Sequence, residues 1–173
     1  MKTSLGILRL FVYGSLKKGF SNHDRYCSGA IGIKPAHLHG RIFKLTPEFP
    51  TIVVPESDIL AFGSADTAYD LFLQEETAKR EEAKRPRGEE DARETRTTRD
   101  RINGEVLSFD DPETRLPAID GLEEYQPGKD SLYSRVLVRV MFPDGFSTTA
   151  WTYAAGFDTG KLERYEGETW FPD

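Results

Sequence analysis

Two short stretches of the sequence carry residue types that could bind or transform a small molecule. In the first, Tyr13, Gly14, Ser15 and Leu16 follow directly on an apolar run. A turn at the end of a strand exposes successive backbone N–H groups, here those of Ser15 and Leu16, and such groups bind an anion without any charged side chain. Ser15 also suggests a nucleophile, but neither a phosphate-binding lysine-serine motif nor a second catalytic serine motif lies near it.

The second stretch is AIDGLEEY, in which Glu123 stands three residues after Asp120. A carboxylate can act as general base and then general acid, provided that burial beside apolar walls raises its pKa. Taken alone, the stretch is more typical of solvated glutamates on an exposed helix. Asp120 is expected to hydrogen-bond within a helix or turn rather than to act as a second base.

The remaining reactive side chains do not form a recognisable site. His37 and His39 would share one face of a strand, but no third ligand accompanies them, so no metal site is expected. Cys27 is the one cysteine, which excludes an intrachain disulfide framework and a cysteine-built zinc site, and it is expected to be structural. The glycines form no dinucleotide fingerprint, so the sequence implies no cofactor.

Length and charge limit the class of protein. The chain has 173 residues, which fits one domain spanning residues 1–173. Its net charge of -6 excludes binding to nucleic acid or to an anionic membrane by overall electrostatic attraction. Arg9 interrupts the N-terminal apolar run and no small-residue cleavage site follows, so a core strand is expected there rather than a signal peptide. No apolar stretch is long enough to span a bilayer. A cytoplasmic protein is therefore expected, of unknown oligomeric state.

Strands dominate the predicted elements. A helix is expected after Asp110, where Asp111 and Pro112 suit a helix N-terminus. A hairpin is expected around the turn at residues 143–145, between two β-branched and aromatic arms. Further strands are predicted at residues 8–13, 37–45, 49–54 and 102–109. Several strands with helices between them indicate an α+β domain.

A charged segment interrupts this pattern at about residues 66–101. Its first part has helical character, with Tyr69, Phe72 and Leu73 available for one face. Residues 74–101 hold nine Lys or Arg and nine Asp or Glu, and such a stretch cannot bury a core of its own. We expect a solvated helix and loop inserted into the domain, with a partner-docking arm as the alternative.

Four pieces in order, FVYGSLKKGFSNH, FPTIV, INGEV and AIDGLEEYQPGKDSLYSRVLVRV, resemble the γ-glutamylcyclotransferase-like family. The closest branch is that of the γ-glutamylamine cyclotransferases and avirulence-induced-gene-like proteins. Its pattern is a strand ending Tyr-Gly-Ser/Thr-Leu-Lys-x-Gly, then Asn-His, a Leu/Ile-Asp-x-x-Glu motif, and Tyr-x-Arg before a valine-rich strand. The resemblance covers about residues 9–54 and 102–157. Glu124 departs from it, because the family commonly has a small residue there.

The resemblance implies a small mixed β-barrel with flanking helices and a cavity where the first strand ends. It also implies a cofactor-free reaction, in which the α-amino group of a γ-glutamyl unit attacks its own γ-carbonyl. The products are 5-oxoproline and the released amine. Glu123 matches the family's catalytic glutamate, and Tyr133 could hydrogen-bond the substrate or Glu123, while Arg135 could pair with a structural acid. The glutamyl-binding stretch corresponds to Tyr13, Gly14, Ser15 and Leu16, and Asn22 and His23 match a loop beside it.

The expected partner is a small γ-glutamyl amine, peptide or conjugate, and the sequence does not select among them. Two hypotheses of another class remain open at this point. The chain could be a non-catalytic module that binds a γ-glutamyl or small carboxylate metabolite. It could also be an interaction protein that acts through residues 74–101.

Overall fold

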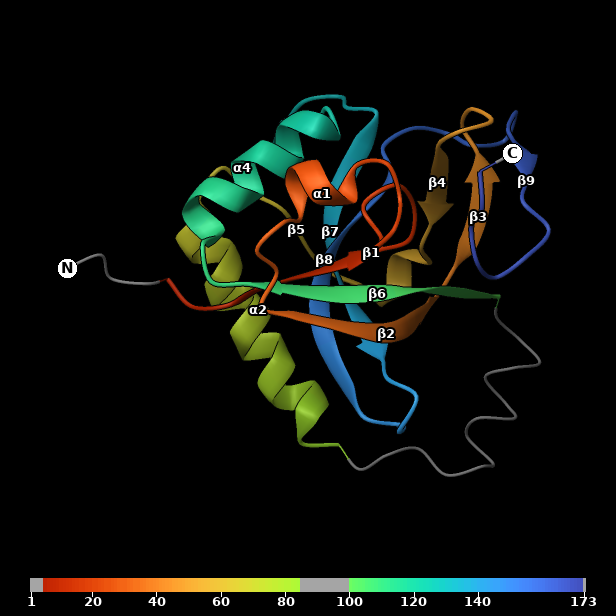
Figure 1. The fold of residues 1–173 in the computed structure, drawn as a ribbon. Coiled ribbons are helices and arrows are strands. Elements are labelled where there is room, and N and C mark those ends of the chain that lie inside the picture. The colour runs from red at the N-terminus through yellow and green to blue at the C-terminus, as the bar shows by residue number, and fades with distance from the viewer. Residues whose placement is uncertain (1–4, 85–99, 173) are drawn as a thin grey trace.

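The computed structural model describes residues 5–84 and 100–172, which form a closed five-stranded β-barrel with helices on its outer face (Figure 1). The barrel strands are β1 (Leu8–Val12), β2 (Gly32–His39), β6 (Arg101–Phe109), β7 (Tyr133–Met141) and β8 (Ser147–Ala155). They follow the order β2-β6-β1-β8-β7, and the pairing of Met141 with His37 closes the ring. Only β1 and β8 pair in parallel among these neighbours. The expected α+β fold, a small mixed barrel with flanking helices, is confirmed.

Alternation along the strands divides the core into two parts. In β1, Leu8 and Leu10 belong to the cluster shared with the helices, whereas Phe11 and Tyr13 belong to the cluster that fills the barrel. This follows from the period of two in a strand, which sends successive side chains to opposite faces. Strand β8 is buried on both faces almost along its whole length. Strand β1 is likewise buried at four of its five positions, with only Arg9 intermediate, so neither face of the N-terminal strand is open to solvent.

Helices α1 (His23–Tyr26), α2 (Thr67–Glu82) and α4 (Pro112–Leu122) lie on the outside of the barrel (Figure 1). Helix α4 starts after Asp111 with Pro112 in its first turn, where the missing proline N–H costs no helical hydrogen bond. Leu116 and Ile119 are buried against the barrel. The expected helix is thus confirmed, and its C-terminal end is held over the end of β1.

The predicted face of α2 is wrong for Tyr69 and Phe72, whereas Leu73 packs, partly buried, against the cluster shared with the helices. Tyr69 and Phe72 are 52% and 57% exposed, whereas the face that packs on β8 carries Leu71, Gln74 and Ala78. The amide of Gln74 donates to the Ile7 carbonyl at 2.7 Å and accepts from the N–H of Arg9 at 2.9 Å. A polar face can be buried here because β8 and the chain at the start of β1 offer hydrogen-bond partners. Helix α2 is consequently packed on the barrel, so the expectation of a solvated helix is wrong for this face of it.

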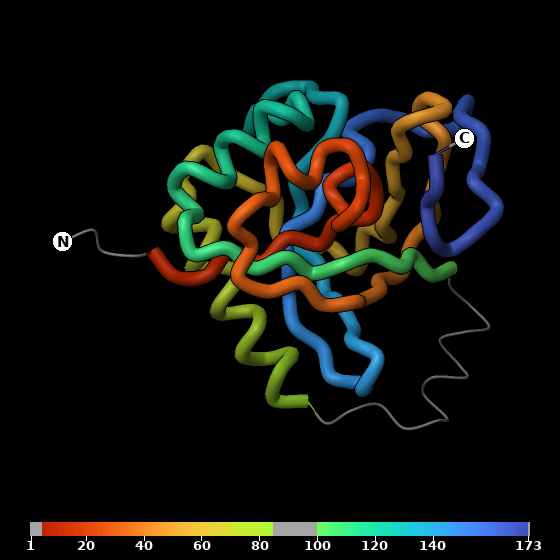
Figure 2. Tube along the Cα trace, in the orientation of Figure 1, coloured from red at the N-terminus to blue at the C-terminus, as the bar shows by residue number. Residues whose placement is uncertain are grey.

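Smaller elements complete the fold. Strands β3 (Arg41–Lys44), β4 (Pro50–Val53) and β9 (Glu163–Arg164) form a separate sheet, and η1 (Glu56–Asp58) leads into β5 (Ile59–Phe62), which pairs with β7. Figure 2 traces the loop after β1 up to β4, where Pro50 lies against Gly14.

Three details differ from the sequence prediction. The strand expected at 37–45 is two strands that part at Gly40, where a Cβ would meet the Val53 carbonyl oxygen at 2.6 Å. The first half of β2 and all of β5 were missed, because neither has a clear alternation. Residues 85–99 of the charged segment lie outside the described residues. Among those described, no helix has the length and apolar character needed to cross a membrane.

Candidate functional site

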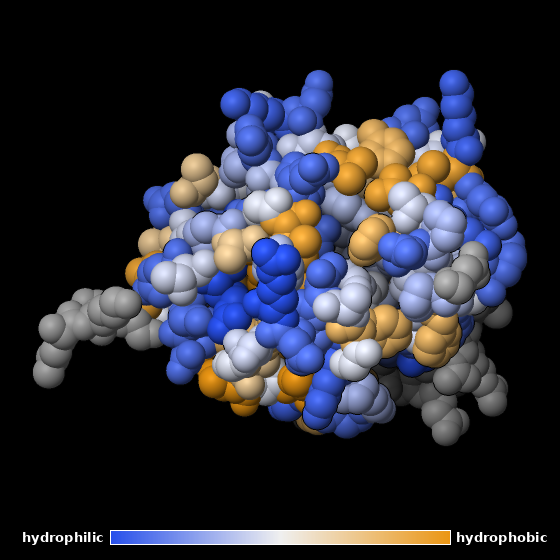
Figure 3. All heavy atoms as spheres, turned by 45° about the horizontal axis from the view of Figure 1, so that its top comes forward, coloured by the Kyte–Doolittle hydropathy of each residue, from blue (hydrophilic) through white to orange (hydrophobic). Residues whose placement is uncertain are grey.

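A pocket opens where β1 ends, between the loop that follows it, the start of β4 and the C-terminal end of α4. The six residues predicted as catalytic or substrate-binding all line it, although they come from three separate regions of the chain, whereas Asn22, His23, Asp120 and Arg135 do not line it. The lining residues are Phe11, Val12, Tyr13, Gly14, Ser15, Leu16, Phe49, Pro50, Glu123, Tyr133 and Tyr153. On the side of the molecule that carries α1 and α4, apolar side chains gather in a broken patch among charged ones (Figure 3).

The loop after β1 presents backbone donors to this pocket. Hydrogen bonds to its backbone carbonyl groups set the shape of the loop. The Gly14 carbonyl accepts from the N–H of Lys17 at 3.1 Å, and the Ser15 carbonyl accepts from the N–H of Asn22 at 3.0 Å. The ring Nδ1 of His23 lies 2.8 Å from the Leu16 carbonyl oxygen. No acceptor within residues 5–84 and 100–172 takes the N–H groups of Ser15 and Leu16. Two neighbouring donors at the pocket wall are therefore available to an anion.

Gly14 is needed for space rather than for an unusual backbone angle. It is not among the glycines with positive φ, so the turn itself would accept another residue. A Cβ at this position, however, would lie 3.0 Å from Cγ and 3.2 Å from Cδ of Pro50. Both residues line the pocket, so the close approach of the loop to β4 sets its width.

Glu123 reaches the pocket from the end of α4, where the chain forms a Schellman motif. The N–H of Tyr125 donates to the Asp120 carbonyl at 2.9 Å and that of Glu124 to the Gly121 carbonyl at 3.3 Å. Glu124 takes a φ of 52°, the left-handed conformation that this motif requires. The geometry separates the two adjacent glutamates: Glu123 turns into the pocket and Glu124 out to solvent.

The left-handed conformation makes Glu124 a source of strain that glycine would relieve. We expect Glu124→Gly to raise the stability of the protein by roughly 0.5–1 kcal/mol, because glycine has no Cβ to clash at positive φ. The free energy of unfolding in urea measures the change. Glu124→Ala is the matched control, since it removes the same charge and keeps the Cβ, and an equal gain there would assign the effect to charge.

The carboxyl group of Glu123 titrates far from its usual range. Burial is the main cause, and the charge of Asp120 adds to it, so that the pKa is raised from 4.5 to about 7. Among the residues that line the pocket, Glu123 is the one carboxylate. A group with this pKa can both take and return a proton near neutral pH.

Three tyrosines surround this carboxyl group, each with its hydroxyl proton donated to the protein. Tyr13 donates to the Tyr153 carbonyl, Tyr133 to the Pro50 carbonyl and Tyr153 to Asp120, each at 2.6 Å. A hydroxyl has a single proton, so toward a ligand these oxygens can only accept. One side of the pocket therefore suits a donor such as an ammonium group, and the loop suits an anion.

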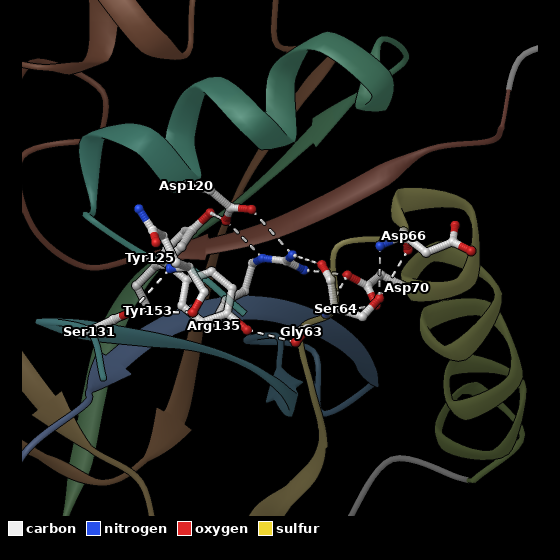
Figure 4. Close-up of polar contacts among 10 residues, drawn as sticks. Gly63, Ser64, Asp66, Asp70, Asp120, Tyr125, Ser131, Arg135 and Tyr153 are labelled. Carbon is white, nitrogen blue, oxygen red and sulfur yellow. Dashed lines mark hydrogen bonds and ion pairs between the residues drawn. The ribbon is translucent and has the colours of Figure 1, made fainter. Parts of the chain in front are cut away.

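Arg135 lies behind the pocket at the centre of a buried polar network (Figure 4). Its guanidinium donates to Asp120 and Asp70, each at 2.8 Å, and to the Ser64 carbonyl at 3.0 Å. Arg135 therefore pairs with two structural acids, Asp70 and Asp120, whereas one was expected from the sequence. No sequence motif pointed to Asp70, which lies in α2, and none pointed to Tyr153 beyond its place in an apolar strand.

The other reactive residues do not line the pocket. Cys27 is buried, which raises its pKa to about 12 and keeps it a thiol. Burial and the charge of Arg101 lower the pKa of His37 to about 4. Across the described ranges, no three His, Cys, Asp or Glu side chains are grouped so as to hold a metal ion.

Comparison with known proteins gives the family. The sequence profile described as "Gamma-glutamyl cyclotransferase, AIG2-like" matches residues 10–68 and 92–172. No curated protein matches the sequence.

Solved structures share the fold at low identity. An AIG2-like protein from Mus musculus has 14% identity and a TM-score of 0.54, over 95% of this chain and 88% of that one. YkqA from Bacillus subtilis has 20% identity and a TM-score of 0.53 over 95% of this chain, which spans only 40% of that protein. An Arabidopsis thaliana protein has 20% identity and a TM-score of 0.51, over 92% of this chain and 70% of that one. The chain belongs to the AIG2-like γ-glutamyl cyclotransferase family.

Proposed function

We propose that this protein is an enzyme that cyclises a γ-glutamyl group to 5-oxoproline and releases the attached amine, with Glu123 as the general base and acid. The observation that carries the proposal is that one pocket is lined both by a carboxyl group of raised pKa and by Ser15 and Leu16, whose backbone N–H groups have no acceptor among the described residues. The charges of the γ-glutamyl group fit this arrangement, because it brings an ammonium, a carboxylate and a carbonyl that becomes an oxyanion.

The chemistry needs few protein groups, since the nucleophile and the electrophile belong to one molecule. Holding the glutamyl chain in its cyclising conformer supplies much of the rate enhancement. Glu123 takes a proton from the α-ammonium, and the freed amine attacks the γ-carbonyl. The C–N bond to the leaving amine breaks as Glu123 returns this proton to the leaving nitrogen. The ring nitrogen gives up its second proton to the released amine, which departs as an ammonium ion. The N–H groups of Ser15 and Leu16 are placed to stabilise either the oxyanion or the α-carboxylate. Tyr13, Tyr133 and Tyr153 offer acceptor oxygens for the ammonium.

A substrate panel tests the proposal. We would incubate the protein with γ-glutamyl amines, γ-glutamyl amino acids and glutathione, and measure 5-oxoproline by mass spectrometry. The proposal expects release from at least one class. Tight binding of 5-oxoproline or glutamate without turnover of any class would instead identify a non-catalytic binding module. The hypothesis of an interaction protein that acts through residues 74–101 has its own test. Deleting residues 85–99 should leave 5-oxoproline release intact if the protein is an enzyme.

The hydroxyl of Ser15 is expected to matter little, because the substrate carries its own nucleophile. It accepts a hydrogen bond from the Asn22 amide at 2.8 Å, so its role is to order the loop. We expect Ser15→Ala to lower kcat/KM less than about tenfold and the melting temperature by about 2–4 °C, which corresponds to one lost hydrogen bond. Steady-state kinetics and a thermal melt measure both effects. A loss of activity as large as that of a Glu123 variant would restore the nucleophile hypothesis.

A further inference from the structure

The polar network behind the pocket has a feature that the proposed reaction does not use: two acids share one arginine. Arg135 is 1% exposed and Asp70 is fully buried, and their ion pair spans 2.8 Å. Asp120 is the second acid, and it also takes the Tyr153 hydroxyl at 2.6 Å. The faces of Tyr125 and Trp151 lie 5.3 and 5.0 Å from the guanidinium carbon, which leaves it little room to move.

Resting on the proposed function, we infer that Asp120 is a positioning residue for Glu123: clamped between Arg135 and Tyr153, it fixes the end of α4 and holds a negative charge one helical turn before the general base. The clamp joins α4 to two barrel strands, since Arg135 belongs to β7 and Tyr153 to β8. Figure 4 shows Asp120 reaching down from α4 to both side chains.

The backbone of Asp120 contributes as well. Its carbonyl accepts the Tyr125 N–H that closes the Schellman motif, and the N–H of Glu123 donates to Ile119 at 3.0 Å. Asp120 is thus bound through its side chain to the barrel and through its main chain to the turn that carries Glu123. Loss of the side-chain contacts would free the helix end by which Glu123 enters the pocket.

The charge of Asp120 acts on Glu123 because the arginine does not cancel it. The cluster of Arg135, Asp70 and Asp120 contains one cation and two acids. Asp120 raises the pKa of Glu123, and neither Asp70 nor Arg135 is a cause of that shift. A stronger base accepts the proton of an ammonium more readily, so the charge serves the reaction.

The other titratable groups that face Glu123 stay neutral near pH 7. They are Tyr13 just after β1, Tyr133 from β7, Tyr153 from β8 and Cys27 after α1, and burial raises the pKa of each above its ordinary value. The carboxyl of Asp120 is therefore the neighbouring charge whose removal should move the titration of Glu123.

The test compares two isosteric variants, Asp120→Asn and Asp70→Asn. Each leaves Arg135 with one acid, so each keeps a balanced buried ion pair and should fold. The pKa of Glu123 is read by NMR of the side-chain carboxyl carbon, assigned with Glu123→Gln, in the protein without substrate. We expect Asp120→Asn to lower it by roughly 0.5–1 pH unit and Asp70→Asn to leave it unchanged.

Kinetics on the same variants supply the second readout. The acidic limb of kcat should move to lower pH in Asp120→Asn and the limiting kcat should fall about threefold, with KM within twofold. An unchanged titration in Asp120→Asn, or an equal shift in Asp70→Asn, would overturn the inference. Asp120→Ser tests the same charge should the first variant not fold. Since the NMR titration needs no turnover, it remains decisive even if no γ-glutamyl compound is a substrate.

Discussion

Replacing Glu123 by glutamine is expected to lower kcat for 5-oxoproline release by about 10²–10⁴-fold, with little change in KM. Glutamine keeps the size of the side chain but cannot take a proton from the substrate ammonium. The wild-type rate should rise with pH through about 7, because only the ionised form of Glu123 is a base, and the variant should lack this limb. Stopped assays from pH 5 to 9 measure both. Turnover at the wild-type rate would remove Glu123 from the mechanism.

The stability of the same variant provides an independent check. Folding raises the pKa of Glu123 from 4.5 to about 7, because the buried site favours the protonated form. The stability that this protonated carboxyl group gives the folded protein is therefore fully present below pH 4.5 and is lost as pH rises through 7. Glutamine has no charge to bury. Glu123→Gln should therefore be more stable than the wild type at pH 8, by on the order of 3 kcal/mol, and equally stable near pH 4.5. A variant that is less stable at pH 8 would indicate a structural carboxylate.

Replacing Gly14 by valine is expected to lower kcat/KM by at least about 10²-fold. The first added carbon already meets the Pro50 ring at 3.0 Å, so the loop and β4 must separate. That movement displaces the N–H groups of Ser15 and Leu16, and a misplacement of about 1 Å is enough for a loss of this size. Initial rates over a series of γ-glutamyl substrate concentrations below and above KM, together with a thermal melt, measure the effect.

Gly121 offers a matched control for this substitution. It lies in α4, two residues before Glu123, and a Cβ there would have nothing within 4 Å. Gly121→Ala should keep the activity and raise the stability by about 0.5–1 kcal/mol, because alanine favours a helix. If Gly14→Val were as active as this control, the width of the pocket would not depend on Gly14.

Much of the fold could be predicted from local pattern. The β7–β8 hairpin and helix α4 follow from alternation and from a proline in the first helical turn, which depend on neighbouring residues only. Strand β5 was not predicted from the sequence, because its four residues are only partly buried and pair with a single neighbouring strand. The packed face of α2 was wrong because Tyr69 and Phe72 suggested an apolar face, whereas the barrel offers partners for Gln74.

The candidate site divides in the same way. Motif order alone selected Glu123 and the stretch from Tyr13 to Leu16, since each motif is a short run that can be recognised without its surroundings. The motif selects Glu123 over its neighbour Glu124, and the left-handed turn at Glu124 is what directs the two side chains apart.

Residue types and their order thus determined the family, the barrel and the residues that gather at the pocket. The tertiary structure decided the properties that arise between distant segments: the raised pKa of Glu123, the width imposed by Pro50 on Gly14, and the two acids that share Arg135. Burial, close approach and charge pairing are relations between atoms brought together by folding. No run of neighbouring residues contains them, because Asp70, Asp120 and Arg135 come from α2, α4 and β7 and meet only once the barrel has closed.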